Sequence, residues 1–320
     1  MILQKTLLAV AVLAIGACGE KTTPATSVAP DSATAVSTPA IETPNEGVPA
    51  AANPALWRTG DADTTVYLFG TVHVLPPTVE WRTQKIDSAL SGSKAVYFET
   101  DLDPAPNDIL PALQKLGMYP PSERLSDKLS DQDRAAFQKA ANDLGLPAFQ
   151  LDGMRPWLAG ITIAEAMITR AGYDSGSGVE RKLAPTAIAA GKEIRKLETV
   201  EQQLLAFADV PEKAQLRFLM DGVRQMDEEA TVLDRMVKAW AAGDVEHLEK
   251  IMIEEDFREM PEIYDALLVK RNRNWAGQID KLVDAEAGTF FIAVGAAHLV
   301  GGDSVIEMLK PLGHTAERVE

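Results

Sequence analysis

Two histidines occupy the same local context at distant points of the chain. His73 follows the apolar run 66–69 and stands third after Gly70, and His298 follows the apolar run 290–294 and stands third after Gly295. A glycine lets the backbone turn sharply where a strand ends. Ligands of open α/β sheets bind at the carboxyl ends of the strands. Because the chain has only four histidines, this repeated strand–Gly-x-x-His pattern predicts one functional site.

Two carboxylates end predicted strands in a similar way. Glu99 closes the run 95–99, and Glu198 closes the run 193–198. Imidazoles and a carboxylate are the donors of a catalytic zinc, manganese or cobalt site, which keeps one position open for water. A cation there lowers the pKa of bound water and makes it a nucleophile. We therefore expect His73, His298 and Glu99 to be metal ligands, and Glu99 and Glu198 to be catalytic.

An arginine lies on an apolar helical stripe. Arg271 is in line with the hydrophobic positions 264, 268, 275, 279 and 282. A buried guanidinium needs an anionic partner or hydrogen-bond acceptors. The candidates are a strand-end glutamate and a carboxylate or carbonyl of the substrate. The alternative is an arginine that snorkels at the edge of the helix. We expect Arg271 to be catalytic and its neighbour Asn272 to donate a hydrogen bond to substrate.

A sheet must bring these positions together. Short apolar runs predict strands at 66–70, 95–99, 193–197 and 289–295, with one more near the C-terminus. Helical spacing, capping residues and glycine stops predict helices at 79–90, 130–145, 156–168, 180–190, 262–283 and 304–309. The strand–helix–strand order at the start predicts parallel pairing. The fold class is helix-rich α/β, with a small central mixed sheet wrapped by many helices.

Residues 216–240 carry apolar side chains at alternating spacings of three and four. This heptad pattern predicts one long helix that ends at Gly243, with Asp244 capping the next helix. The pattern allows a dimerising coiled coil or a helix packed on its own domain, and we favour the latter. The oligomeric state is not determined by the sequence.

The first fifty residues differ from the rest. Residues 1–17 have a lysine, an apolar run and small residues, which is typical of a signal peptide, and residues 15–18 resemble a bacterial lipobox. This resemblance implies cleavage before Cys18 and lipidation of its thiol; an ordinary signal peptide with an incidental cysteine is the alternative. Residues 18–53 are rich in Pro, Ala and Thr and predict a disordered linker. Residues 54–320 form the folded domain.

Composition excludes several classes of protein. The 320 residues carry a net charge of −16, which argues against a nucleic-acid partner. The single cysteine excludes an intramolecular disulfide and any site built from several cysteines. The chain contains no His-Glu-x-x-His, Gly-x-Ser-x-Gly or P-loop motif.

Several motifs together resemble the TraB/GumN (TraB/PrgY/GumN) family over about residues 55–319. They are segments 68–73, 96–101, 155–157, 197–203, 240–244, 270–274 and 294–304. The family is similar to the Tiki proteins, which are membrane-tethered metalloproteases dependent on Mn²⁺ or Co²⁺. In fold it more distantly resembles the erythromycin esterases and the ChaN haem-binding lipoproteins.

The resemblance implies roles for individual residues. His73 and His298 match the two Gly-x-x-His histidines, and Glu99 matches the glutamate after the second strand. Trp157 falls in a Lys-Pro-Trp-like motif in which an arginine replaces the lysine, and we expect it to bind substrate. Segment 178–183 replaces a Gly-x-Asp-x-x-Leu-like motif, with Glu180 in place of the aspartate.

These observations predict a metal-dependent peptide hydrolase anchored by lipid to the cell envelope. Because Gly19 is not an aspartate, resemblance to the usual sorting rule places the anchor in the outer membrane, facing the periplasm. Three alternatives stay open. They are a lipoprotein that binds haem, metal or peptide without turnover, a metal-free hydrolase in which a histidine acts as base with Glu99 as its partner, and a structural envelope protein.

Overall fold

The computed structural model describes residues 52–226, 229–255, 257 and 259–320. The predicted signal peptide, Cys18 and nearly all of the predicted linker 18–53 lie outside these residues. In the part of the chain that is described, no helix is both long and apolar enough to cross a membrane.

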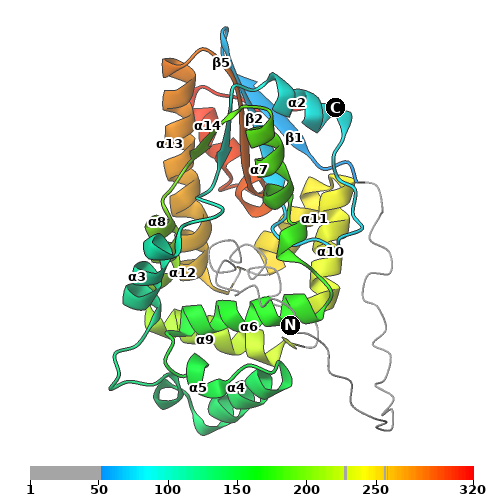
Figure 1. Cartoon of the computed structure of the whole chain (residues 1–320). Helices are drawn as coiled ribbons and strands as arrows, with labels where there is room; N and C mark the ends of the chain where they lie inside the picture. The colour runs from blue at the N-terminus through cyan, green and yellow to red at the C-terminus, as the bar shows by residue number, and fades with distance from the viewer. Residues whose placement is uncertain (1–51, 227–228, 256, 258) are drawn as a thin grey trace, which may run out of the picture.

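A six-stranded mixed sheet forms one end of the molecule (Figure 1). Its strands lie in the order β4-β3-β5-β2-β1-β6. The first four in this order are parallel, β1 is antiparallel to β2, and β6 is antiparallel to β1. Their bounds are β1 Leu56–Gly60, β2 Thr64–Thr71, β3 Ala95–Phe98, β4 Glu193–Lys196, β5 Gly288–Gly295 and β6 Glu317–Arg318. The predicted α/β class with a mixed sheet is confirmed, and β1 is a strand that the sequence analysis did not predict.

Alternating side chains bury both faces of the sheet. Leu68, Phe290 and Ile292 pack with Trp275 on the face covered by α13 (Lys270–Ala285) and α14 (Val305–Leu309). On the other face, Phe291 joins the larger core with α2 (Gln84–Gly92) and α7 (Val179–Ala189). This alternation follows from the two-residue period of a strand. The four parallel strands end on the same side of the sheet, and the helices packed on both faces hold these carboxyl ends in place.

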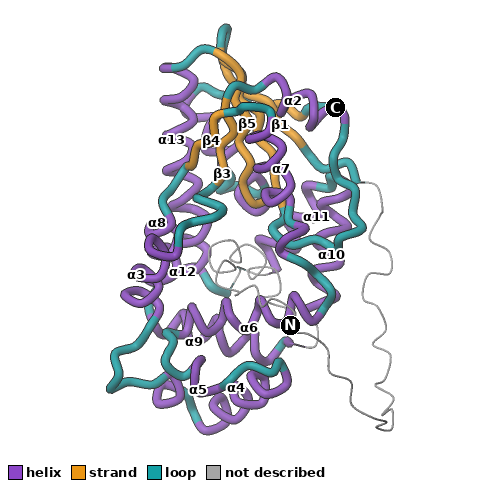
Figure 2. The backbone as a smooth tube through the Cα atoms, in the orientation of Figure 1, coloured by secondary structure: helices purple, strands orange, loops and turns teal. Residues whose placement is uncertain are grey.

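The remaining helices extend from that edge, and Figure 2 shows them as a largely helical second half of the molecule. α6 packs along α9, and α4 and α5 complete a separate apolar cluster with them. The helices here and between the two halves are α3 Pro106–Gly117, α4 Asp131–Asp143, α5 Ala148–Leu151, α6 Pro156–Arg170, α8 Val200–Ala208, α9 Glu212–Arg224, α10 Glu229–Ala242, α11 Val245–Glu249 and α12 Pro261–Tyr264.

The prediction of one long heptad helix over 216–240 is wrong. The structure has α9, which ends at Arg224, and a separate α10, which begins at Glu229. Leu219 and Val223 pack in the α4–α6 cluster, whereas Leu233 and Val237 pack in the main core below the sheet. Two different packing partners explain the break. The apolar stripe is buried within the domain, as expected for internal packing rather than for a coiled coil.

Two other helix predictions need adjustment. The predicted helix 79–90 begins later, at Gln84, because Thr83 caps its N-terminus. The predicted helix 262–283 contains α12 and α13 with a π-helical turn, Asp265–Val269, between them. Such wide turns are frequent at functional sites. This one ends immediately before the first turn of α13, which carries Arg271.

Candidate functional site

Buried polar residues gather at the carboxyl edge of the parallel strands. His73 follows β2, Glu99 follows β3, Glu198 follows β4, and His298 lies in the 3₁₀ turn after β5. The first turn of α13 adds Arg271 and Asn272, and the first turn of α7 adds Glu180. All seven are at most 7% exposed. We call this set the strand-end cluster: His73, Glu99, Glu180, Glu198, Arg271, Asn272 and His298.

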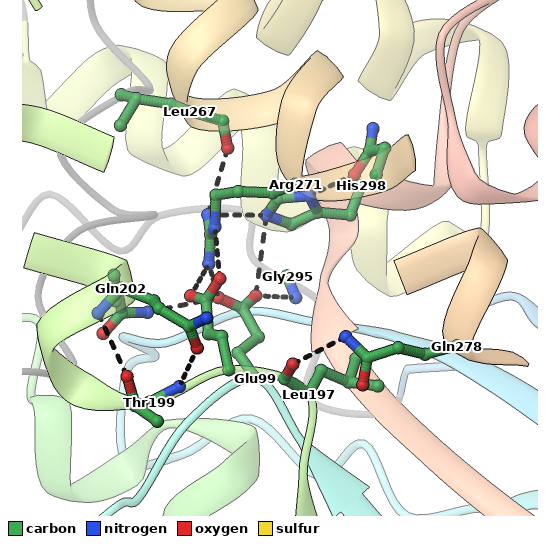
Figure 3. A network of polar contacts seen from close by, with 12 residues as sticks. Glu99, Leu197, Thr199, Gln202, Leu267, Arg271, Gln278, Gly295 and His298 are labelled. Atoms are coloured by element: carbon green, nitrogen blue, oxygen red, sulfur yellow. Dashed lines mark hydrogen bonds and ion pairs between the residues drawn. The ribbon is translucent and has the colours of Figure 1, made fainter. Parts of the chain in front are cut away.

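Arg271 is the hub of the strand-end cluster (Figure 3). Its Nη2 donates to Glu99 Oε2 at 2.6 Å and to Glu198 Oε1 at 2.7 Å, and its Nε donates to Glu198 Oε2 at 3.2 Å. Its Nη1 donates to the Leu267 carbonyl at 3.0 Å and lies 3.1 Å from His298 Nε2. A guanidinium has five N–H donors, so every donor faces an acceptor. Arg271 therefore organises the cluster and has no donor left for a substrate.

Asn272 fixes the state of His298. The Asn272 amide nitrogen donates to the Asp303 carbonyl at 2.8 Å, so its oxygen faces His298 Nδ1 at 2.6 Å. Nδ1 consequently carries the hydrogen, and the Nε2 lone pair faces Arg271. Burial lowers the pKa of His298 to about 3, because Glu99 only partly opposes the cost of desolvating the charged ring. His298 is thus a neutral imidazole with a defined tautomer.

Glu180 plays the corresponding part for His73. Its Oε1 lies 2.7 Å from His73 Nδ1 and also accepts a hydrogen bond from Thr71 Oγ1. Burial alone would lower the pKa of His73, but the carboxylates of Glu180 and Glu99 together outweigh burial and the pKa is raised. His73 Nε2 is buried without a hydrogen-bond partner among the described residues. A buried nitrogen left in this way indicates a place for a ligand or water.

Gly295 packs closely against Glu99 and the two histidines. A Cβ at this position would lie 3.2 Å from Glu99 Oε1 and 3.3 Å from His73 Nε2. Neither Gly70 nor Gly295 has a positive φ, so no left-handed backbone conformation requires glycine at these two positions. Close approach explains them instead: a Cβ on Gly70 would lie 3.2 Å from the Ala296 Cα.

The two strand-end glutamates have opposite electrostatics. Burial opposes ionisation of Glu99, but Arg271, the two histidines and the Gly295 N–H, which donates a hydrogen bond of 2.7 Å, together outweigh burial and lower the pKa to about 2. Glu99 is therefore a permanent anion. Burial raises the pKa of Glu198 in spite of its contacts with Arg271. Glu198 is thus the carboxylate of the pair better suited to exchange a proton.

A groove of about 550 Å³ reaches the strand-end cluster beside α8. We call it the α8 groove; it lies between α8 and the stretch from α12 to the start of α13. Glu198 and Arg271 line it, and they are nearly buried, whereas the lining residues Asp209 and Glu262 are exposed. Glu198 and Arg271 therefore form its deep end.

The histidines and Glu99 have the chemistry of a metal site. Each histidine has its Nδ1 beside an acceptor oxygen, an arrangement that orients metal-binding imidazoles, and Glu99 Oε1 lies 3.7 Å from His298 Nε2. As they stand, the described side chains include no group of three or more His, Cys, Asp or Glu residues poised to hold a metal ion. Arg271 explains this, because it contacts His298 Nε2 and both strand-end glutamates. His73 Nε2, which has no hydrogen-bond partner among the described residues, is the ring nitrogen that a ligand could meet without displacing a protein contact.

The family model described as TraB/PrgY/gumN matches residues 55–318. The chain belongs to the TraB/PrgY/gumN family. It is 22% identical over 257 residues to the uncharacterised protein YbaP of Escherichia coli K12, which covers 80% of this chain and 92% of YbaP. A YbaP of Shigella flexneri gives the same values, and an uncharacterised protein of Treponema pallidum is 22% identical over 267 residues, covering 79% of each chain. No solved structure matches significantly.

Two residues expected to bind substrate in this TraB/PrgY/gumN chain are engaged elsewhere. Trp157 is 1% exposed, donates its indole N–H to the Leu116 carbonyl and stacks on Phe207. It belongs to the core and lies outside the strand-end cluster. Asn272 is in the cluster, but both ends of its amide are used, so it positions His298 instead of facing the groove.

The sequence analysis missed two members of this environment. Glu180 was noted as a departure from a motif, but its pairing with His73 was not foreseen because α7 is distant in sequence. Gln203, on α8, places its amide 3.4 Å from Glu99 Oε2 and is also buried. Its only signal was its place in segment 197–203, one of the motifs that resemble the family.

Proposed function

We propose that the protein is a metal-dependent hydrolase of peptide bonds. One observation carries the proposal: two imidazoles, each with Nδ1 within 2.7 Å of an acceptor oxygen, and the Glu99 carboxylate lie around Gly295 at the end of β5. Resemblance to the Tiki metalloproteases supports the same reaction class. The α8 groove, which ends at Glu198, supplies an access route for a substrate.

His73 Nε2, His298 Nε2 and Glu99 would hold a divalent manganese, cobalt or zinc ion. When bound, such an ion lowers the pKa of a water molecule and polarises a carbonyl. His298 must give up its contact with Arg271 to serve as a ligand, while Asn272 keeps its orientation. The imidazoles bind a cation only in the neutral form, and burial already holds His298 neutral.

The remaining residues of the cluster position and transfer protons. Arg271 holds Glu99 and Glu198 a fixed distance apart through one guanidinium. Glu198, at the deep end of the α8 groove and with a raised pKa, accepts and returns the proton at its carboxylate. Gly295 lets Glu99 and both histidines approach the end of β5 closely because it has no side chain.

Metal content tests this proposal directly. We expect purified wild-type protein without a histidine tag to carry, or take up, close to one equivalent of Mn, Co or Zn, measured by mass spectrometry. In the double variant His73→Asn, His298→Asn the metal should be lost, because asparagine can place an N–H near the Nδ1 position but has no Nε2. Equal metal binding by both proteins, or none by either after loading, contradicts the proposal.

A metal-free hydrolase is a second candidate, and the His73–Glu180 contact of 2.7 Å favours it. A carboxylate beside Nδ1 orients an imidazole as a general base. Glu180 is the carboxylate in contact with His73, whereas Glu99 lies 3.7 Å from His298. Peptide hydrolysis that persists in a strong chelator and is lost in His73→Asn identifies this mechanism. Haem binding is not favoured, because both imidazoles are buried and a haem needs an open face beside its ligand.

We further propose that lipid on Cys18 anchors the protein to the cell envelope, in the outer membrane and facing the periplasm. The support is the lipobox-like segment 15–18 and the composition of residues 18–53. Cells fed labelled palmitate should incorporate the label into the wild-type protein and not into Cys18→Ala. Unlabelled wild-type protein contradicts the anchor without touching the proposed reaction.

A further inference from the structure

The α8 groove has an apolar floor and a negatively charged rim. Leu205, Ala206, Val210 and Ala266 supply apolar lining, and Asp209, Glu262 and Asp265 supply carboxylates nearer the solvent. Concave sites of this size with few polar groups are where proteins bind ligands. The apolar floor can contact apolar side chains of a bound peptide. The acidic rim favours basic side chains on that peptide over acidic ones.

The cations of the groove are already neutralised. Lys270 lies 2.8 Å from Asp265, and Arg271 is shared by Glu99 and Glu198. Within the described residues, the carboxylates of Asp209 and Glu262 have no hydrogen bond or ion pair. The groove thus offers two unneutralised anions at its rim and no unpaired cation in its lining.

A second hollow, which adjoins the α8 groove, is lined by two cationic side chains. It shares Pro211 and Glu262 with the groove and is also lined by Lys213 and Arg217. Arg217 is bound by Glu259 at 2.8 Å. Lys213 belongs to this hollow and does not line the α8 groove, so the groove keeps its negative character.

We propose that the α8 groove binds a peptide segment in which a lysine or arginine is flanked by apolar residues. The basic side chain meets Asp209 and Glu262, and the apolar side chains lie along the floor. The chain then leads to Glu198 and Arg271 at the deep end. Charge complementarity selects this occupant, because an acidic segment would meet like charges at the rim. The inference rests on the proposed function, for which it names the substrate class.

Binding of a blocked eight-residue peptide tests the inference. The probe has one central lysine between leucine and alanine residues and carries a fluorophore; its counterpart has glutamate in place of the lysine. Fluorescence anisotropy gives Kd for wild type and for the double variant Asp209→Asn, Glu262→Gln. We expect the lysine peptide to bind wild type and to bind this variant about 3- to 10-fold more weakly, since each partly exposed charge contributes modestly.

The matched control is Glu246→Gln, Asp284→Asn, which removes the same charge from exposed positions outside the groove. Its Kd should equal that of wild type. The inference is overturned if the lysine peptide does not bind, if the glutamate peptide binds equally well, or if the groove variant binds like the control.

The same assay separates this inference from the proposed function. His73→Asn, His298→Asn leaves the groove lining intact, so it should bind the lysine peptide while losing metal and hydrolysis. Basic-peptide binding without any hydrolysis in wild type would uphold the groove and contradict the hydrolase. Hydrolysis of neutral and acidic peptides as fast as basic ones would uphold the hydrolase and contradict the groove.

Discussion

Replacing Arg271 by methionine should lower the free energy of unfolding by about 3–5 kcal/mol, which is the usual loss when one partner of a buried ion pair is removed. Arg271 is 7% exposed and is the cation shared by Glu99 and Glu198, which are 2% and 5% exposed. Methionine fills a similar volume but leaves two carboxylates in the core without their counter-charge. Urea unfolding followed by circular dichroism measures the loss.

Neutralising the partners should recover part of this loss. The triple variant Glu99→Gln, Glu198→Gln, Arg271→Met no longer buries an unpaired charge, so it should be more stable than Arg271→Met alone. Arg217→Met is the surface control: its arginine is about half exposed and should contribute less than about 1 kcal/mol. An Arg271→Met protein as stable as the control variant is incompatible with a hub that holds two buried anions.

In contrast to Arg271→Met, the variant His73→Asn should lose most of its hydrolytic activity and little of its free energy of unfolding. The Nε2 atom has no protein partner among the described residues, so its removal breaks no hydrogen bond. The asparagine amide can still meet Glu180 near the original Nδ1 position. We expect hydrolysis of a peptide that wild type cleaves to fall about 10²- to 10⁴-fold, the range typical for a positioned acid–base or ligand group.

The unfolding curve of His73→Asn should lie within about 1 kcal/mol of wild type. His247→Asn is the matched control, because His247 is exposed on α11 and lies outside the strand-end cluster. It should keep full activity. If His73→Asn retains wild-type hydrolysis, His73 is a core residue, and neither the metal-dependent nor the metal-free reaction that we propose uses it.

The convergence of the site was predictable from local patterns. His73, Glu99 and His298 each follow an apolar run directly or within a few residues, Glu198 follows a weaker and more polar strand segment, and parallel strands bring such positions to one edge. Arg271 was placed by a different signal, its position on an apolar helical stripe. Burial of a guanidinium there required anions, and the strand-end glutamates supply them.

What could not be predicted depends on distant packing. The pairing of Glu180 with His73 spans more than a hundred residues and needs the docking of α7. The steric role of Gly295 is visible only when Glu99 and His73 are in place around it. The heptad pattern over 216–240 does not reveal that its two halves pack on different clusters. Periodicity reports that a face is buried, but not against what.

The pairing of β2 with β5 has a consequence for the order of folding. Thr64 lies beside Gly288, and Thr71 beside Gly295, so two central strands that are neighbours in the sheet are made at opposite ends of synthesis. Contacts this distant in sequence form slowly, because a long loop must close first. β5 lies between β3 and β2 in the sheet. Until β5 has been made, β2 and β3 each have one edge without a neighbouring strand. The central pairing of the sheet can therefore form only after most of the described chain has been made.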